Sequence, residues 1–259
     1  APRQGVITVA GKTFLIAQAQ GVISVSSASY RGTGLAGEAI ASAFGSSLAT
    51  SIQLATTLPL PTTLAGTTLK VKDLLGIELP APLLYVSPDQ VNFQMPSGLV
   101  PGPVTVTVTN SQGAVSIGTA VNDVVAPGLF AANLDGQGVP AADLLRVKSD
   151  GSQSYEQVAR YDSALKRYVA VPINLGPPED QVYLILYGTG FRHRTSLAAV
   201  SILMGNAEMS AQYAGAQGYY VGLDQVNILI SRSLIGHGET DIMMTIDGRT
   251  ANILRVNVL

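Results

Sequence analysis

Alternation of apolar and polar residues is the clearest pattern in this chain. Residues 104–109 read Val-Thr-Val-Thr-Val-Thr, and residues 241–246 read Asp-Ile-Met-Met-Thr-Ile before an Asp-Gly pair at 247–248. A period of two places one set of side chains on a core and the other in water, as in a half-buried strand. Asp-Gly between strand-like segments predicts a tight hairpin turn. We therefore expect a final strand over residues 251–258.

The tetrad Asp-Gln-Val-Asn occurs twice, at residues 89–92 and again at residues 224–227. Each copy precedes a short apolar stretch, a glycine-bearing turn and a β-rich segment. Repetition after the length of a whole domain predicts two copies of one β-module. The repeat extends upstream, because an aromatic residue leads into a glycine bend at Phe44-Gly45 and again at Tyr187-Gly188.

Within the tetrads we expect a structural role. Val91 and Val226 are predicted to point inward, and the Asp and Asn side chains are predicted to satisfy backbone donors at a strand entry. Two ligand sites at equivalent loops are the alternative interpretation.

The chain divides into three parts in this interpretation. Residues 1–20 are an N-terminal β-strand extension, residues 21–125 a first β-sandwich, and residues 126–259 a second. A Pro/Gly bend at 126–128 joins the sandwiches without a long linker. The second sandwich carries an inserted hairpin at 134–178, with strands on both sides of a turn at 149–152 and a further turn at 162–164.

The N-terminal extension is predicted to form a hairpin about a turn at residues 10–12. An isolated hairpin is marginal in water, so we expect its strands to add to a sheet of this chain or of a neighbouring one. The candidate residues for burial in an assembly interface are Ile7, Val9, Phe14 and Ile16.

Composition narrows the class of partner. Apolar residues make up 47% of the chain and charged residues only 12%, well below the roughly 25% of ordinary soluble domains. The net charge of −2 and the lack of basic clusters argue against nucleic acid. No apolar stretch reaches the roughly 20 residues of a membrane span.

Cysteine is absent, which excludes disulfides, thiolate metal sites and cysteine nucleophiles. The lack of cysteine fits a secreted protein, and a cytosolic protein can lack cysteine as well. The start at Ala1-Pro2-Arg3, without Met, fits both a mature product that has lost a signal peptide and a trimmed chain.

No catalytic constellation emerges from the motifs. Residues 32–37 match Gly-x-Gly-x-x-Gly, but the acidic residue that a dinucleotide site needs about 20 positions later is missing. His193 and His237 stand in turn-like settings, and no Gly-x-Ser-x-Gly elbow exists. Residues 133–138 faintly resemble a calcium loop whose twelfth position is Leu144 rather than Glu. We expect no enzyme activity, no cofactor and no metal.

Three tyrosines form a candidate ligand-binding group, because Tyr219 and Tyr220 are adjacent and Tyr213 is near them in sequence. An aromatic platform for sugars is one interpretation. The other is that these residues lie on a sheet face or an interface.

Seven short motifs follow one another along the chain in the order in which a known protein family has them. They are residues 26–30 (Ser-Ser-Ala-Ser-Tyr), 43–46 (Ala-Phe-Gly-Ser), 85–94 (Tyr-Val-Ser-Pro-Asp-Gln-Val-Asn-Phe-Gln), 126–130 (Ala-Pro-Gly-Leu-Phe), 172–176 (Pro-Ile-Asn-Leu-Gly), 186–190 (Leu-Tyr-Gly-Thr-Gly) and 221–227 (Val-Gly-Leu-Asp-Gln-Val-Asn). Over residues 22–259 the chain resembles the uncharacterised C-terminal domain of secreted acidobacterial (Solibacter-type) proteins. Residues 1–20 resemble the last two strands of a BACON-type module.

The resemblance implies an all-β fold, with two tandem immunoglobulin-like (IPT/TIG-type) β-sandwiches behind an N-terminal hairpin. It implies a secreted or cell-surface location and transfers no catalytic residue. We expect an extracellular structural subunit that assembles with itself into a fibre or surface layer, by donating its N-terminal strands to a neighbour. The alternative is an adhesin-like module that binds surface glycans.

Overall fold

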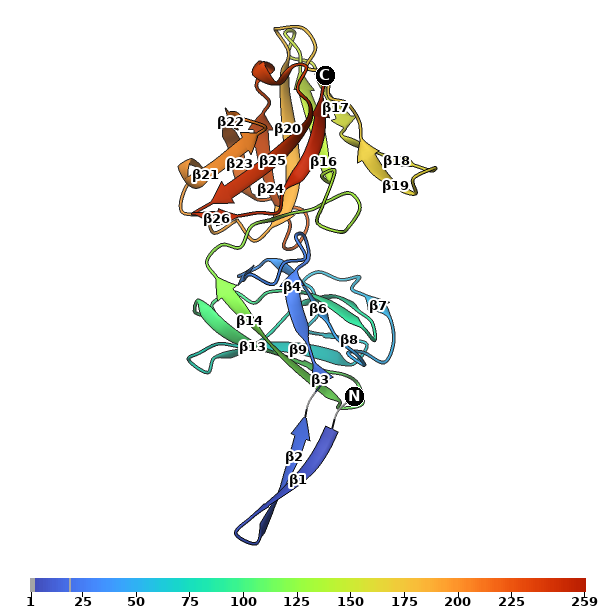
Figure 1. Cartoon of the computed structure of the whole chain (residues 1–259), viewed down its shortest axis with the longest axis vertical. Helices are drawn as coiled ribbons and strands as arrows, with labels where there is room; N and C mark the ends of the chain where they lie inside the picture. The colour runs from blue at the N-terminus through green and yellow to red at the C-terminus, as the bar shows by residue number, and fades with distance from the viewer. Residues whose placement is uncertain (1–2, 19) are drawn as a thin grey trace. The chain divides into compact units, whose positions relative to one another are not determined.

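The computed structural model describes residues 3–18 and 20–259, and the side chains of residues 6–13 and 21–259. The described chain is all-β (Figure 1), and its only helical segments are two 3₁₀ turns, η1 (Leu197–Ala199) and η2 (Arg232–Leu234). Each of its two compact units contains two larger sheets and one two-stranded hairpin. The predicted fold class, two tandem immunoglobulin-like β-sandwiches with an N-terminal hairpin, is confirmed.

The two units are not continuous in sequence. The first consists of Ala1–Val25 and Ala41–Asn122, the second of Ser26–Ile40 and Asp123–Leu259. The sequence predicts one boundary near residue 125, whereas the segment Ser26–Ile40, which contains β5 (Leu35–Ala36), groups with the second unit. Side-chain contacts explain this grouping. The Ile40 N–H donates to Thr189 Oγ1 at 2.8 Å, and Arg31 Nη1 donates to the Ala251 carbonyl at 3.3 Å.

The first unit is built on the predicted alternating strand. Val104, Val106 and Val108 are buried, while the threonines between them are partly exposed. One sheet runs in the order β10 (Glu78–Pro80), β9 (Thr67–Lys72), β13 (Gly102–Thr109), β14 (Val115–Asp123) and β3 (Gln20–Gly21), with β8 (Thr63–Leu64) also on β9. The other runs in the order β4 (Ile23–Ser26), β6 (Ile40–Phe44), β12 (Gln90–Gln94), β11 (Leu83–Val86) and β7 (Gln53–Leu54).

The second unit has the same two-sheet plan. One sheet runs in the order β17 (Gln153–Gln157), β16 (Ala142–Val147), β20 (Gln181–Thr189), β24 (Asp224–Leu229) and β23 (Ala211–Ala216), with β15 (Gly128–Leu129) also on β20. The other contains β22 (Ala207–Met209), β21 (Val200–Met204), β25 (Gly238–Ile246), β26 (Arg249–Thr250) and β27 (Leu254–Val258). Leu184 and Val226 from one sheet share a core with Ile202 and Met244 from the other.

Turns in the second unit follow the sequence signals with one exception. Asp247 and Gly248 both have positive φ, as the predicted hairpin requires. The inserted segment forms the pair β16–β17 and a separate hairpin, β18 (Ala159–Asp162) with β19 (Arg167–Ala170). The expected strand over 251–258 was wrong at its start, because β27 begins only at Leu254. Asn252 is buried there, and its side chain bonds both the N–H and the carbonyl of Leu129. At this residue a side-chain amide thus takes the place of a backbone hydrogen-bond ladder between strands.

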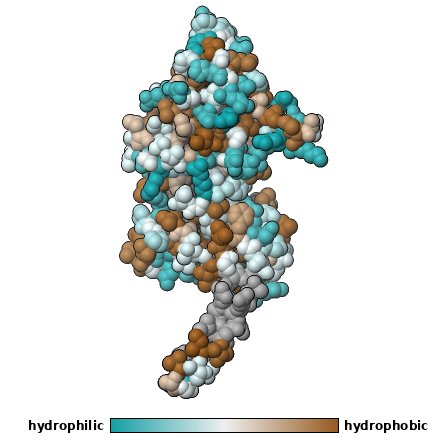
Figure 2. Space-filling model, viewed as in Figure 1, coloured by the Kyte–Doolittle hydropathy of each residue, from teal (hydrophilic) through white to brown (hydrophobic). Residues whose placement is uncertain are grey.

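The N-terminal hairpin consists of β1 (Arg3–Val9) and β2 (Lys12–Gln18), which pair over their full length. Among the described residues, neither strand joins another sheet. Val6, Ile7 and Val9 are 61%, 49% and 57% exposed. Figure 2 shows hydrophobic surface, in brown, on the described part of the hairpin. The side chains of Phe14 and Ile16 lie outside the described residues. Among the side chains that the structure describes, Ile7 and Val9 therefore stay about half exposed.

The duplicated tetrads occupy equivalent places. Val91 and Val226 are fully buried, as predicted, and in each copy the Gln amide donates to the Asn side chain two residues later at 2.7 Å. The tetrad strands β12 and β24 adjoin β6 and β20, the strands that carry the repeated aromatic-Gly motif. The topology thus preserves the repeat seen in the sequence.

The two tetrad aspartates differ in their surroundings. Asp224 is fully buried, where it accepts bonds from the Phe191 N–H and from Arg192 Nε, both at 2.8 Å. Burial raises the pKa of Asp224 against the opposing effect of these donors. Asp89 is exposed and accepts from the Ser87 hydroxyl at 2.6 Å. The predicted satisfaction of a backbone donor therefore holds at Asp224, whereas Asp89 has a side-chain donor.

This difference gives a matched pair of substitutions. Asp224→Ala leaves the partly buried Arg192 guanidinium without its carboxylate and should lower the free energy of unfolding by about 3–5 kcal/mol. Asp89→Ala removes one exposed hydrogen bond and should cost no more than about 1 kcal/mol. Urea unfolding followed by circular dichroism measures both. Equal, small losses would show that the buried pair does not have the stabilising role assigned to it.

Candidate functional site

The outward face of one sheet in the second unit carries an aromatic row. On β20, Val182, Leu184 and Leu186 point to the core, so Tyr183 and Tyr187 lie on the opposite face. Strand register extends the row sideways. Leu145 of β16 stands opposite both Tyr155 of β17 and Tyr183 of β20, and Leu229 of β24 stands opposite Tyr183 on its other side.

A second row lies beside the first on the same face. Its members are opposite one another across five strands, in the order Gln157, Asp143, Ile185, Asn227 and Tyr213. We call this surface, with Tyr155, Tyr183, Tyr187 and Tyr213, the tyrosine face. It combines rings with amide side chains and has a single carboxylate within its two rows.

Hydrogen bonds hold two of these rings along the sheet. The Tyr183 hydroxyl donates to Oε1 of Gln181 at 2.9 Å, and the Tyr187 hydroxyl donates to Oδ2 of Asp143 at 3.0 Å. A tyrosine can reach a partner on the same strand or the next one only if its ring leans over the sheet. The rings are therefore fixed before any ligand arrives, which reduces the entropy lost on binding.

The Tyr187 hydroxyl remains a neutral donor over the physiological range. Partial burial raises the pKa of Tyr187 to about 12, and the hydrogen bond to the Asp143 carboxylate acts in the same direction. The hydrogen bond from Tyr187 of β20 to Asp143 of β16 thus persists at neutral pH.

Hydrogen bonds on the inner side of the sheet hold the edge strand that carries Tyr155. Arg146, on the inner side of β16, donates from Nε and Nη2 to Glu156 of β17 at 2.6 and 3.2 Å. Its Nη1 donates to Asp180 at 3.1 Å. The hydrogen bond to Glu156, followed by that to Asp180, raises the pKa of Arg146. Tyr155 itself is 69% exposed on the outer side of this strand.

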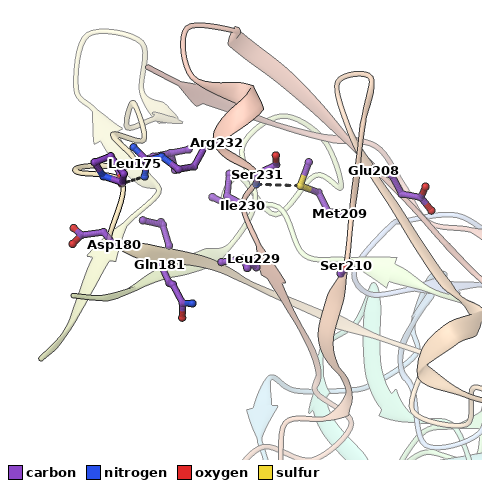
Figure 3. Close-up of a pocket in the computed structure, with 12 residues that line it drawn as sticks. Leu175, Asp180, Gln181, Glu208, Met209, Ser210, Leu229, Ile230, Ser231 and Arg232 are labelled. Carbon is purple, nitrogen blue, oxygen red and sulfur yellow. Dashed lines mark hydrogen bonds between the residues drawn. The ribbon is translucent and has the colours of Figure 1, made fainter. Parts of the chain in front are cut away.

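A hollow of about 390 Å³ opens at the end of the aromatic row (Figure 3). It lies where β20 begins and β24 ends, and Gln181 and Leu229 of the tyrosine face are part of its lining. Arg232 closes one side, because its guanidinium donates to the carbonyls of Leu175, Gly176 and Pro177. The floor is apolar and the rim is polar, with lining residues that include Val182, Met209, Ile230, Asp180, Glu208 and Ser231.

The three tyrosines proposed from the sequence are not gathered in one row. Tyr213 lies on β23 within the tyrosine face and is 39% exposed, with its hydroxyl bonded to the Ala216 carbonyl. Tyr219 and Tyr220 lie in the following loop and are 86% and 70% exposed. Gln217 accepts a bond from the backbone N–H of each.

Sequence reasoning missed Tyr155, Tyr183 and Tyr187. A signal for two of them existed, because an even spacing of four places Tyr183 and Tyr187 on one face of a strand whose other face is Val182, Leu184 and Leu186. Tyr155 joins them only through strand register, which the sequence does not reveal.

Other sequence candidates occupy structural settings. The Gly-x-Gly-x-x-Gly segment contains β5 and is followed by the strand β6 rather than by a helix. His193 pairs with Glu38 at 2.9 Å, and Asn133 of the calcium-like loop bonds the backbone of Tyr168. Within residues 3–18 and 20–259, no group of three or more His, Asp or Glu side chains is placed to hold a metal ion. No helix in the same residues has the length and hydrophobicity needed to span a bilayer.

Comparisons with known proteins identify no family. No protein-family model and no curated protein matches the chain. It is similar at 9% identity and a TM-score of 0.34 to the SGBP-B protein of a Bacteroides ovatus mixed-linkage glucan utilization locus, in complex with a heptasaccharide, over 88% of this chain and 43% of that one. An auxiliary nutrient binding protein from Bacteroides ovatus matches at 11% identity and a TM-score of 0.25, over 66% of this chain and 46% of that one.

A tandem repeat from the extending region of a large adhesion protein matches at 10% identity and a TM-score of 0.23, over 93% of this chain and 73% of that one. The chain spans less than half the length of the two Bacteroides ovatus structures. Likenesses this distant carry no argument about function, and the resemblance to the acidobacterial family stays a prediction.

Proposed function

We propose that this chain is an extracellular, cell-surface binding module of the adhesin type, and that it binds neutral carbohydrate through the tyrosine face. The observation that carries the proposal is the aromatic row of Tyr155 and Tyr183, held on a rigid sheet beside amide side chains. Binding, rather than catalysis, is the activity we assign to this face.

The chemistry of the face suits a sugar ring. The C–H groups on one side of a pyranose are apolar and pack on an aromatic ring, while its hydroxyls need partners that both donate and accept. Gln157, Gln181 and Asn227 supply such amides within the face. Gln181 and Asn227 each accept one hydrogen bond from a neighbouring side chain. A purely apolar partner would cover their remaining polar atoms without offering a hydrogen-bond partner, which costs free energy.

Substitution of one ring tests the proposal. Tyr183→Ala removes the central stacking surface, and the gel retardation of the full chain by a neutral polysaccharide should weaken at least about fivefold. Affinity electrophoresis in gels that contain a panel of soluble polysaccharides measures the effect, with circular dichroism to confirm that the variant folds.

Tyr161→Ala is the matched control. Tyr161 is also exposed, at 55%, but it lies on the separate β18–β19 hairpin, where its ring packs against Tyr168. This variant should bind as the parent does. If the parent is retarded by none of the polysaccharides, or if both variants lose binding equally, the proposed function is wrong.

Self-association is a second candidate function, and the N-terminal hairpin favours it. Two-stranded sheets are marginal in water, and Val6, Ile7 and Val9 are exposed on both sides of this one. Addition of β1 or β2 to a sheet edge of another copy would pair their free backbone groups and cover these side chains. The chain would then be a structural subunit of a homopolymer, such as a fibre or surface layer.

Deletion of residues 1–18 tests this second candidate and leaves β3 in place on β14. The full chain should sediment as an oligomer and the truncated chain as a monomer with unchanged β-sheet content, as measured by analytical ultracentrifugation and circular dichroism. The double variant Ile7→Ser with Val9→Ser should act in the same direction while keeping the hairpin's length. A monomeric full chain would exclude this assembly.

A further inference from the structure

The spacing of the two row tyrosines is fixed by the sheet. Tyr155 and Tyr183 stand opposite the same residue, Leu145, on the strand between them. They are therefore two strands apart, a separation of about 10 Å across the strands. The spacing depends on backbone hydrogen bonding rather than on side-chain rotamers, so it does not adapt freely to a ligand.

The separation of about 10 Å between the two tyrosines fits some glycan chain conformations and not others. In an extended β-1,4-linked pyranose chain, successive rings are turned over, so every second ring presents the same side and the repeat has a length similar to this separation. Compact, coiled α-linked chains do not present rings at such intervals along a line. An extended chain that crosses the strands at right angles would stack its first and third rings on Tyr155 and Tyr183.

The charges around the row select a neutral chain. Asp143 is the carboxylate of the neighbouring row, and Glu208 lines the hollow at the row's end, where the carboxylate of Asp180 is paired with Arg146. The guanidinium of Arg232 is committed to three backbone carbonyls. A chain of uronic acids would meet the carboxylates of Asp143 and Glu208 with like charge, whereas hydroxyl groups can donate hydrogen bonds to them.

The hollow gives the chain a place to continue. Leu229 is the next member of the row after Tyr183 and also lines the hollow, as does Gln181 (Figure 3). A volume of about 390 Å³ is large enough for a sugar ring with its water. A chain stacked on both tyrosines would therefore direct its next ring into a polar-rimmed hollow rather than into bulk solvent.

From these observations we infer that the tyrosine face binds an extended, neutral β-1,4-linked glycan that lies across the strands from Tyr155 over Tyr183 toward the hollow. The inference rests on the proposed carbohydrate-binding function and adds the linkage, the charge and the direction of the ligand. A minimum of three sugar rings is needed to contact both tyrosines.

Calorimetric titration of the full chain with β-1,4-linked glucose oligomers of two to six rings tests this ligand class. Affinity should rise about tenfold between the disaccharide and the trisaccharide, because only the trisaccharide reaches both rings. The rise should vanish in Tyr155→Ala and in Tyr183→Ala, and should persist in the control Tyr161→Ala. α-1,4-linked glucose oligomers and oligogalacturonate of equal length should bind at least about tenfold more weakly.

The outcomes of this titration distinguish failure of the inference from failure of the proposed carbohydrate-binding function. Binding of β-1,4-linked oligomers without a step at three rings, or equal binding of α-linked oligomers, overturns the inference and leaves carbohydrate binding by the face intact. Binding to no oligomer and to no polysaccharide overturns both. A self-association of the parent that Tyr183→Ala abolishes would show that the face pairs with a second copy of the chain, and would also overturn the inference.

Discussion

Strand alternation in β20 is the constraint on which the second unit depends. This strand lies in the middle of its sheet, and its even-numbered residues Val182, Leu184 and Leu186 form part of the core. Burial of each such side chain contributes about 1.5–3 kcal/mol relative to exposure. A slip of one residue would exchange the two faces and place the tyrosines in the core. The same free energy that folds the sheet therefore fixes where Tyr183 and Tyr187 point.

The two copies of the module have diverged around a shared frame. Both keep the buried valine of the tetrad and the Gln-to-Asn hydrogen bond. Only the second copy buries its aspartate against an arginine, and only the second carries the inserted strands β16 and β17 before the duplicated aromatic-Gly motif. The insertion supplies Asp143, Leu145 and Tyr155, which together extend the outer face of β20 sideways. The sheet that contains β20 is thus wider than a sheet of the bare repeat, and its outer face carries tyrosine rings.

Local patterns in the sequence predicted much of the fold. Alternation predicted β13 and β25, and the Asp-Gly pair at 247–248 predicted the hairpin turn that ends β25. Other features of the structure have long-range causes, which local patterns do not carry. Asn252 interrupts the last strand because its side chain bonds Leu129, more than a hundred residues away in sequence. The segment Ser26–Ile40 groups with the second unit through partners such as Thr189. Tyr155 and Tyr183 share one row only because of the strand register, which the sequence does not reveal. The sequence pattern therefore pointed to the adjacent Tyr219 and Tyr220 instead.

The central claim is that a glycan lies across the strands of the tyrosine face. Amide chemical-shift mapping by NMR, with the isotope-labelled full chain and a hexamer of β-1,4-linked glucose, tests it most directly. The account predicts that the largest shifts follow one line across β17, β16, β20 and β24, through Tyr155, Leu145, Tyr183 and Leu229. Shifts confined to the loop of Tyr219 and Tyr220, to the N-terminal hairpin, or to the length of a single strand would contradict it.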